Sequence, residues 1–333
     1  MKKYKVYGLG AALVDTEIKV DDQDLNAMGV DKGMMTLVDQ DRQSELLQHL
    51  TGHMVKASHA SGGSAGNSMI AAALFGAPTF MTCKVANDED GAIYLADMEA
   101  AGVDHCLRNG RPEGTTGKCL VLITPDAERS MNTFLAISES LSEEQLDPPA
   151  IEDSEYLYIE GYLVTSPTGR AAAIRAREIA EAAGVKTSLS LSDPGMVEFF
   201  RDGLAEMIGG GVDLVFCNEE EALGWGQTDD MDSAIEALKA IARQFVITRG
   251  SRGALAFDGE ALHEIPAHQV QAVDTNGAGD MFAGAFLYSV TRGEDFPTAG
   301  RFASLAAGKV VSRYGPRLPA EDHPALRASF FGD

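Results

Sequence analysis

The sequence has few cysteines and no long apolar run, and both absences restrict the class of protein. Its 333 residues include four cysteines without Cys-x-x-Cys spacing, which argues against a disulfide scaffold and favours reduced thiols in the core. No apolar run approaches the ~20 residues that a membrane helix needs, and the apolar part of the N-terminal segment is too short for a signal peptide. We therefore expect a cytoplasmic protein that binds no membrane.

Basic residues are also scarce. There are 27 Lys and Arg residues against 50 Asp and Glu residues, which gives a formal net charge of −23. Nucleic-acid binding depends on basic patches that neutralise phosphates, so this balance argues against a nucleic-acid partner. A nucleotide substrate needs only local positive charge and is not excluded.

The usual sequence signatures of nucleotide and zinc sites are missing. The run Gly8-x-Gly10 lacks the third glycine of a dinucleotide-binding turn, because position 13 is Leu13. The segment from Gly114 to Cys119 fails the spacing of a Walker A loop. The seven histidines show no zinc-binding spacing.

The most informative stretch is Asp274-Thr-Asn-Gly-Ala-Gly-Asp280, which precedes an apolar segment with helical spacing. Small residues at 277–279 allow the backbone to approach a ligand, and the first amides and the dipole of the following helix favour an anion. Asp280 falls in the first helical turn, where the dipole favours the ionised carboxylate and leaves it able to accept a proton. The simpler alternative is a glycine-rich turn whose carboxylate only complements the dipole.

The C-terminal half alternates between expected strands and helices. Strands are predicted at 156–159, 186–191, 214–216 and 245–248, and helices at 168–183, 196–208, 231–242 and 296–311. Such alternation predicts a mainly parallel sheet with helices on both faces. Asp15 follows the first strand, at the edge where open α/β sheets bind ligands. Glu160 and Asp193 also follow strand ends, and each is a ligand contact, a helix cap or a solvated acid.

Two segments depart from this alternation. Residues 14–38 and 110–135 are rich in short β-like runs and turns, which predicts one small sheet assembled from both segments. We therefore predict an α/β catalytic core made of residues 1–13, 39–109 and 136–333, and a small β unit made of residues 14–38 and 110–135, which the family resemblance described below implies is a lid.

The run from Ser61 to Asn67 has two interpretations. Gly62-x-Ser64-x-Gly66 matches the nucleophile elbow of α/β-hydrolases, with Ser64 as the nucleophile. An elbow follows a strongly apolar strand, however, whereas residues 56–60 are small and polar. We favour the second interpretation, in which glycines 62 and 63 bring the backbone against a polyhydroxylated substrate and Asn67 binds its hydroxyl groups.

Taken in order from Gly8 to Gly315, these motifs resemble those of the ribokinase-like (PfkB) carbohydrate and nucleoside kinases. The run from Asp274 to Asp280 resembles the C-terminal signature of that family, and the Gly-Gly-x-x-x-Asn run from Gly62 resembles its N-terminal motif. The Asn276 variant is typical of adenosine kinases, and the resemblance is strongest to bacterial ones.

The resemblance implies a three-layer α/β sandwich with a mainly parallel sheet and a β lid. It also implies an enzyme that transfers the γ-phosphoryl group of ATP to the 5′-hydroxyl of a ribose-containing substrate, with adenosine as the first candidate. A sugar kinase of the ribokinase or fructokinase type is the alternative, because few aromatic residues are in place to sandwich a purine and Glu160 is more typical of sugar kinases. A monomer and a homodimer both remain open.

The same resemblance implies roles for individual residues. Asp280 would be the catalytic base, with the anion hole at Gly277, Ala278 and Gly279. Arg129, which the residues alone would class as a surface arginine, would move over the phosphates. The acceptor would be bound by Asp15, Gly62, Gly63 and Asn67, with Phe134 beside the nucleobase. The nucleotide would be bound by Asn218, Thr248, Gly250, Gly253 and Asn276. Glu221 would act indirectly on Mg²⁺, and the backbone of Asp274 and Arg313 would hold a monovalent cation such as K⁺.

Overall fold

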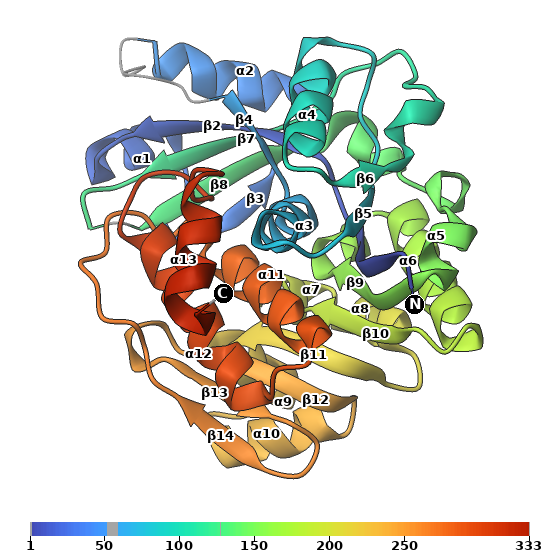
Figure 1. Ribbon diagram of the computed structural model, residues 1–333. Coiled ribbons are helices and arrows are strands. Elements are labelled where there is room, and N and C mark those ends of the chain that lie inside the picture. The colour runs from blue at the N-terminus through green and yellow to red at the C-terminus, as the bar shows by residue number, and fades with distance from the viewer. Residues whose placement is uncertain (1, 52–58, 127, 333) are drawn as a thin grey trace.

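The computed structural model describes residues 2–51, 59–126 and 128–332, and these form two sheets (Figure 1). The large sheet has nine strands in the order β14-β13-β12-β11-β10-β9-β1-β5-β6. Neighbouring strands from β6 to β12 are parallel, and β13 and β14 are added in antiparallel orientation. The bounds are β1 Tyr4–Leu9, β5 Thr79–Thr82, β6 Asp104–His105, β9 Ser154–Glu160, β10 Lys186–Ser190, β11 Val212–Asn218, β12 Ala242–Thr248, β13 Ala254–Phe257 and β14 Leu262–Ile265.

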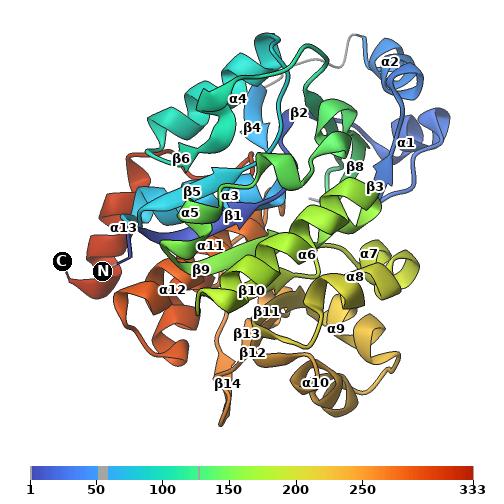
Figure 2. The ribbon, with the colours of Figure 1, turned by 90° about the vertical axis from the view of Figure 1, so that its right-hand side faces the viewer.

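The strands of the large sheet send alternate side chains into two hydrophobic layers. In β9, Tyr156 and Tyr158 join one layer, whereas Leu157 and Ile159 join the other, and all four are buried. Both faces are therefore apolar, and helices cover both of them, as parallel sheets require (Figure 2). The predicted α/β architecture with a mainly parallel central sheet is confirmed.

The helices divide between these two layers. The layer that contains Tyr158 is covered by α3 (Ser64–Phe75), α11 (Ala278–Arg292), α12 (Phe296–Val311) and α13 (Asp322–Phe331), with α4 (Glu89–Ala100) at its edge. The layer that contains Leu157 is covered by α5 (Pro148–Glu152), α6 (Pro167–Ala182), α7 (Pro194–Phe199), α8 (Arg201–Ile208), α9 (Glu219–Gly226) and α10 (Met231–Lys239).

The small sheet has the strand order β3-β8-β7-β2-β4. Its strands are β2 (Leu13–Lys19), β3 (Met35–Leu37), β4 (His59–Gly62), β7 (Gly117–Ile123) and β8 (Arg129–Phe134). Helices α1 (Asp22–Met28) and α2 (Gln40–His49) pack on one face, where Leu25 and Leu46 meet Ile18 and Leu122. Figures 1 and 2 show this sheet at one end of the molecule, with α1 and α2 on its outer side.

Several elements differ from the sequence-based expectations. Helix α3 begins at Ser64, within the run from Ser61 to Asn67, so Asn67 lies in its first turn. The helix expected at 196–208 is two helices that meet at Phe200, whose backbone leaves the helical region. Helix α1 was not expected, although Asp21 and Asp24 form a capping box at its start.

The small sheet extends beyond the predicted lid ranges of 14–38 and 110–135. Strand β4 comes from the range assigned to the core, and it pairs with β2 at the edge of the sheet. Its short polar sequence gave no strand signal. The movement of this unit as a lid stays a prediction. No helix within residues 2–51, 59–126 and 128–332 has the length and apolar character needed to cross a membrane.

We expect Leu157→Ala to destabilise the protein by about 2–5 kcal/mol, because Leu157 is fully buried in β9 and its truncation leaves a cavity. The matched control is Leu262→Ala on edge strand β14, where Leu262 is 43% exposed, and its effect should stay within ~0.5 kcal/mol. Urea unfolding of the two variants and the parent measures both values. Equal shifts in the two variants would contradict the assigned core.

Candidate active site

A cavity of about 560 Å³ lies between the large sheet, the N-terminus of α11 and one face of the small sheet. This volume suits a small-molecule site. Consecutive strands of the large sheet end at its wall, through Glu160 of β9, Ser190 of β10, Asn218 of β11 and Thr248 of β12. The cavity therefore lies at the carboxyl ends of the parallel strands, where α/β sheets generally bind ligands.

Asp280 faces this cavity and is held by two side chains of α3. Ser64 Oγ donates to Asp280 Oδ1 at 2.6 Å, and Asn67 Nδ2 donates to Asp280 Oδ2 at 2.9 Å. Residues three apart on a helix share one face, so the first turn of α3 presents both donors together. Helices α3 and α11 approach so closely that a β-carbon on Gly284 would lie 2.5 Å from the Ser68 carbonyl oxygen.

The environment of Asp280 suits a general base. Burial raises the pKa of its carboxyl group, whereas the hydrogen bonds from Ser64 and Asn67 and the charge of Arg129 act in the opposite direction. The net result is a raised pKa. A carboxylate with a raised pKa accepts a proton more readily than an ordinary aspartate.

The N-terminus of α11 is built to approach a ligand. Gly277 precedes the helix in the left-handed region with φ 71°, and a β-carbon there would lie 2.1 Å from the Pro316 carbonyl oxygen. Gly277 has no side chain that could cap this helix, and the space beside Gly279 is open among the residues that the structure describes. The first amides of α11, which have no intrahelical partners, can therefore bind an anion from the cavity.

Asp274 stabilises the loop that leads to α11. Its carboxylate is fully buried and accepts hydrogen bonds from the amides of Asn276 at 2.9 Å and Gly315 at 3.0 Å. The glycine-rich loop and the segment after α12 are therefore fixed to each other. Among the described residues, Asn276 Nδ2 is buried without a hydrogen-bond partner, and Asn276 lines the cavity. A ligand with an acceptor atom would satisfy this donor.

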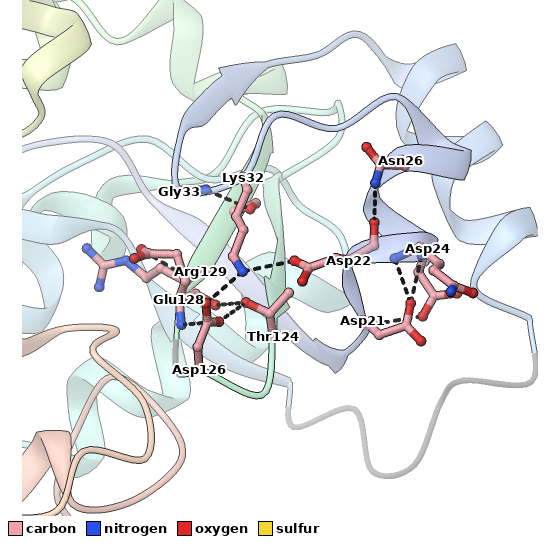
Figure 3. A network of polar contacts seen from close by, with 12 residues as sticks. Asp21, Asp22, Asp24, Asn26, Lys32, Gly33, Thr124, Asp126, Glu128 and Arg129 are labelled. Atoms are coloured by element: carbon pink, nitrogen blue, oxygen red, sulfur yellow. Dashed lines mark hydrogen bonds and ion pairs between the residues drawn. The ribbon is translucent and has the colours of Figure 1, made fainter.

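Arg129 connects the small sheet to the anion-binding loop. Its Nη1 donates to the Thr275 carbonyl oxygen at 2.7 Å and to Asn276 Oδ1 at 3.4 Å. Nearby, Lys32 pairs with Asp22 at 2.9 Å and with Asp126 at 2.7 Å, which joins α1 to the turn between β7 and β8 (Figure 3). Figure 3 shows the Arg129 guanidinium pointing away from that network.

Asp15 of β2 forms the opposite wall of the cavity. It is 7% exposed, and burial raises its pKa to about 7, although the positive charge of Arg317 opposes this shift. Gly62 lies behind it, because a β-carbon there would come within 2.2 Å of Asp15 Oδ1. Among the described residues, Asn67 Oδ1 is also buried without a partner, so the Asp15 side of the cavity presents acceptors for hydroxyl groups.

The nucleotide-binding candidates lie at the ends of β11 and β12. Asn218 and Glu221 form a capping box in which Asn218 Nδ2 donates to Glu221 Oε1 at 2.7 Å and the Asn218 amide donates to Glu221 Oε2 at 3.0 Å. Both carboxylate oxygens of Glu221 are thus engaged, and burial raises its pKa to about 8. Thr248, Gly250 and Gly253 line the same part of the cavity.

The acidic residues of the site suit a metal ion that is bound mainly by phosphates and water. Within the described part of the chain, no group of three or more His, Cys, Asp or Glu side chains is placed to hold a metal ion. Mg²⁺ commonly keeps several waters and binds through one or two carboxylates plus substrate phosphates. The engaged carboxylate of Glu221 agrees with an indirect role at such an ion.

Four of the predicted site residues do not line the cavity: Gly62, Phe134, Asp274 and Arg313. Arg129, Met131 and Thr133 of β8 face the cavity, so strand alternation turns Phe134 to the other face of the small sheet. The Arg313 side chain pairs with Asp322 at 3.0 Å, and because a guanidinium has no acceptor atom, a cation could be bound only by the Arg313 backbone carbonyl.

Sequence reasoning missed three contributors to the site. Ser64 holds Asp280, but it had been considered only as a nucleophile. Arg317 binds Ser61 Oγ at 2.8 Å and Asp97 Oδ2 at 3.1 Å, and no sequence signal marked these contacts. An apolar wall from the small sheet could have been found from the alternation in β8, and it consists of Leu13, Met35, Leu37, Cys119, Met131 and Leu135.

The structure does not support Ser64 as the nucleophile of a hydrolase. A nucleophile elbow follows a strand of the main parallel sheet, whereas β4 is an antiparallel edge strand of the small sheet. Ser64 Oγ also donates directly to a carboxylate, without the intervening histidine of a catalytic triad.

This geometry suits the transfer of a phosphoryl group to an alcohol, and the comparisons with known proteins show that the chain is an enzyme of this class. Residues 27–323 match the pfkB family carbohydrate kinase model, and the chain belongs to this family. Membership implies the use of ATP together with a divalent metal ion.

The relatives include both adenosine and sugar kinases. The structure of adenosine kinase from Sinorhizobium meliloti is 35% identical, with a TM-score of 0.92 and a match that covers 98% of this chain and 99% of that one. A probable sugar kinase from Rhizobium etli CFN 42 is 33% identical, with a TM-score of 0.92 and coverage of 99% and 100%. Adenosine kinase 1 of Arabidopsis thaliana is 28% identical over 338 residues, which cover 94% of this chain and 95% of the relative.

We expect Arg317→Gln to move the acid limb of kcat/KM for the alcohol acceptor upward by about one pH unit. The Arg317 charge lowers the pKa of Asp15, so its loss raises that pKa above about 7, and the ionised form is then present only at higher pH. The matched control is Arg327→Gln, which removes the same charge and one hydrogen bond to the Phe75 carbonyl oxygen outside the cavity. A pH profile that is the same for both variants and the parent would contradict the coupling.

Proposed function

We propose that this enzyme transfers the γ-phosphoryl group of ATP to the 5′-hydroxyl of adenosine or a closely related nucleoside. The observation that carries the proposal is the position of Asp280, which is fixed by Ser64 and Asn67 directly beside the anion-binding N-terminus of α11. A base and a charge-stabilising site are thereby adjacent, as the transfer of a phosphoryl group to a hydroxyl requires.

Each residue of the site then has a defined task. Asp280 accepts the proton of the attacking hydroxyl, while Asp15 and Asn67 bind the other hydroxyl groups of the ribose. The amides of Gly277, Ala278 and Gly279 stabilise charge on the transferring group, and Arg129 contributes positive charge from the small sheet. Asn218 and Glu221 would hold Mg²⁺ indirectly, and the bound ion would supply positive charge against the phosphates.

A monovalent cation is part of the same proposal. The backbone of Asp274 and Arg313 would hold an ion such as K⁺, because the hydrogen bond from the Gly315 amide to Asp274 joins the two loops to which they belong. Such an ion would add positive charge behind the anion-binding loop.

The face of the small sheet favours a nucleoside over a free sugar. The register pairs Asp15 with Cys119, Cys119 with Thr133, and Thr133 with Leu37, so one row of side chains runs from a carboxylate to an apolar end. Met35 pairs with Met131 beside that apolar end. An acceptor whose polar ribose binds Asp15 would therefore place a flat, largely apolar base against Met35, Leu37 and Met131.

The contacts of Glu160 weaken one argument for the sugar-kinase alternative. Glu160 was considered as a sugar ligand, but its two oxygens accept hydrogen bonds from the amides of Ala11 and Ala65. The name of the Rhizobium etli relative still favours a sugar acceptor, so both acceptor classes belong in the test.

We expect Asp280→Asn to lower kcat at least about 100-fold with every acceptor, because the amide cannot take up the hydroxyl proton, while ATP binding measured by calorimetry stays unchanged. The assay is ADP release from ATP and Mg²⁺ with adenosine, other nucleosides, ribose and fructose. Turnover by the parent with adenosine but not with ribose or fructose is the expected pattern. Turnover with the free sugars alone would overturn the nucleoside proposal, and full activity of Asp280→Asn would overturn the mechanism.

We expect Met131→Gln to raise KM for adenosine about tenfold, with kcat and the KM for ATP nearly unchanged, because the substitution makes the apolar wall polar without touching the base. Met34→Gln is the matched control, since Met34 is exposed and outside the cavity lining. Steady-state kinetics of both variants decide the matter, and an unchanged KM for adenosine in Met131→Gln would argue against a base at this wall.

A further inference from the structure

Glu160 is an almost completely buried carboxylate that joins two segments of the active site. It ends β9, is 1% exposed, and lies against Gly10, where a β-carbon would come within 2.3 Å of Glu160 Oε2. Its Oε1 accepts from the Ala11 amide at 2.7 Å, and its Oε2 accepts from the Ala65 amide at 2.8 Å. Short hydrogen bonds to an ionised acceptor are stronger than neutral ones.

The hydrogen bond from the Ala65 amide fixes the start of α3. Gly63, which precedes this helix, has no side chain that could cap it, so one of the free N-terminal amides is satisfied by the Glu160 carboxylate at the end of β9. Ala65 lies between Ser64 and Asn67, which hold the two oxygens of Asp280. A shift of this turn would therefore move both donors away from Asp280.

The hydrogen bond from the Ala11 amide fixes the turn between β1 and β2. Ala11 lies four residues before Asp15, which forms the acceptor side of the cavity. The carboxylate of Glu160 thus sets the distance between the two segments that carry Asp15 and the donors to Asp280. Because Glu160 is the last residue of β9, both segments are held in place relative to the large sheet.

We propose that Glu160 is a positioning residue for phosphoryl transfer. Its carboxylate accepts from the Ala11 and Ala65 amides and so keeps the β1–β2 turn and the first turn of α3 in a fixed relative position. This inference rests on the proposed kinase function, but the contact that carries it can be tested independently. Glu160 acts through Ser64, Asn67 and Asp15 and is not itself a catalytic residue.

The chain offers a matched control in Asp193. This carboxylate also follows a strand of the large sheet, is 9% exposed and accepts from a helix N-terminal amide, that of Gly195 at 2.8 Å. The helix that it caps is α7, and neither Asp193 nor any residue of α7 lines the cavity. Both variants remove one carboxylate charge and keep one acceptor oxygen, so an effect of charge removal alone would appear in both, whereas a loss of positioning would appear only in Glu160→Gln.

The experiment compares Glu160→Gln and Asp193→Asn with the parent enzyme. The glutamine has nearly the same shape but only one acceptor oxygen, so it can hold only one of the two amides. We expect kcat to fall at least about tenfold and KM for the acceptor to rise about threefold or more, while calorimetry gives an unchanged Kd for ATP. Asp193→Asn should keep kcat and KM within about twofold of the parent, even if both variants melt at a lower temperature.

Three results would overturn the proposal. These are kinetic constants of Glu160→Gln within about twofold of the parent, an equal loss of kcat in Asp193→Asn, or a loss of ATP affinity that matches the loss of kcat. If Glu160→Gln does not fold, amide hydrogen exchange of the parent decides, because exchange of Ala11 and Ala65 at unprotected rates is incompatible with the contact. If the parent phosphorylates no acceptor, the proposed function fails, whereas the exchange measurement still tests the Glu160 contacts.

Discussion

The close packing of α3 against α11 is the constraint on which the active site depends. Gly284 lets the two helices approach, and their N-terminal turns then meet at Asp280, which takes hydrogen bonds from Ser64 and Asn67. The same approach places the anion-binding amides of α11 beside the carboxylate. Because these groups come from two helices that are rigid and packed on one sheet, the base and the anion site keep a fixed relation without any loop having to order.

The site concentrates buried carboxylates in a chain that is already strongly acidic. Burial raises the pKa of Asp15 and Glu160 to about 7, that of Glu221 to about 8, and that of Asp280 in the same direction. These carboxylates are not matched by an equal number of basic side chains. Glu160 and Glu221 are instead stabilised mainly by hydrogen bonds from amide groups. In the proposed function, a triphosphate entering this region would meet more acids than bases, so the helix N-terminus, Arg129 and a metal ion together would supply the attraction.

The sequence was sufficient for the features that depend on local chain properties. The alternation of strands and helices predicted the parallel sheet, and the glycine-rich run predicted the start of α11. The failures have a different origin. Strand β4 carries no strand signal and exists because β2 offers an edge, Phe134 faces away because its register is set by β7, and Arg317 acts through residues that are distant in sequence. Such contacts are tertiary, and no local pattern encodes them.

The two sheets contribute different parts of the candidate active site. The base, the anion site and the nucleotide-binding candidates lie on elements of the large sheet, whereas the apolar wall and Arg129 come from the small one. Changes to the wall can therefore alter which acceptor fits without disturbing the proton acceptor. In the proposed function, the acceptor is selected at the face of the small sheet, and the chemistry is set where α3 meets α11.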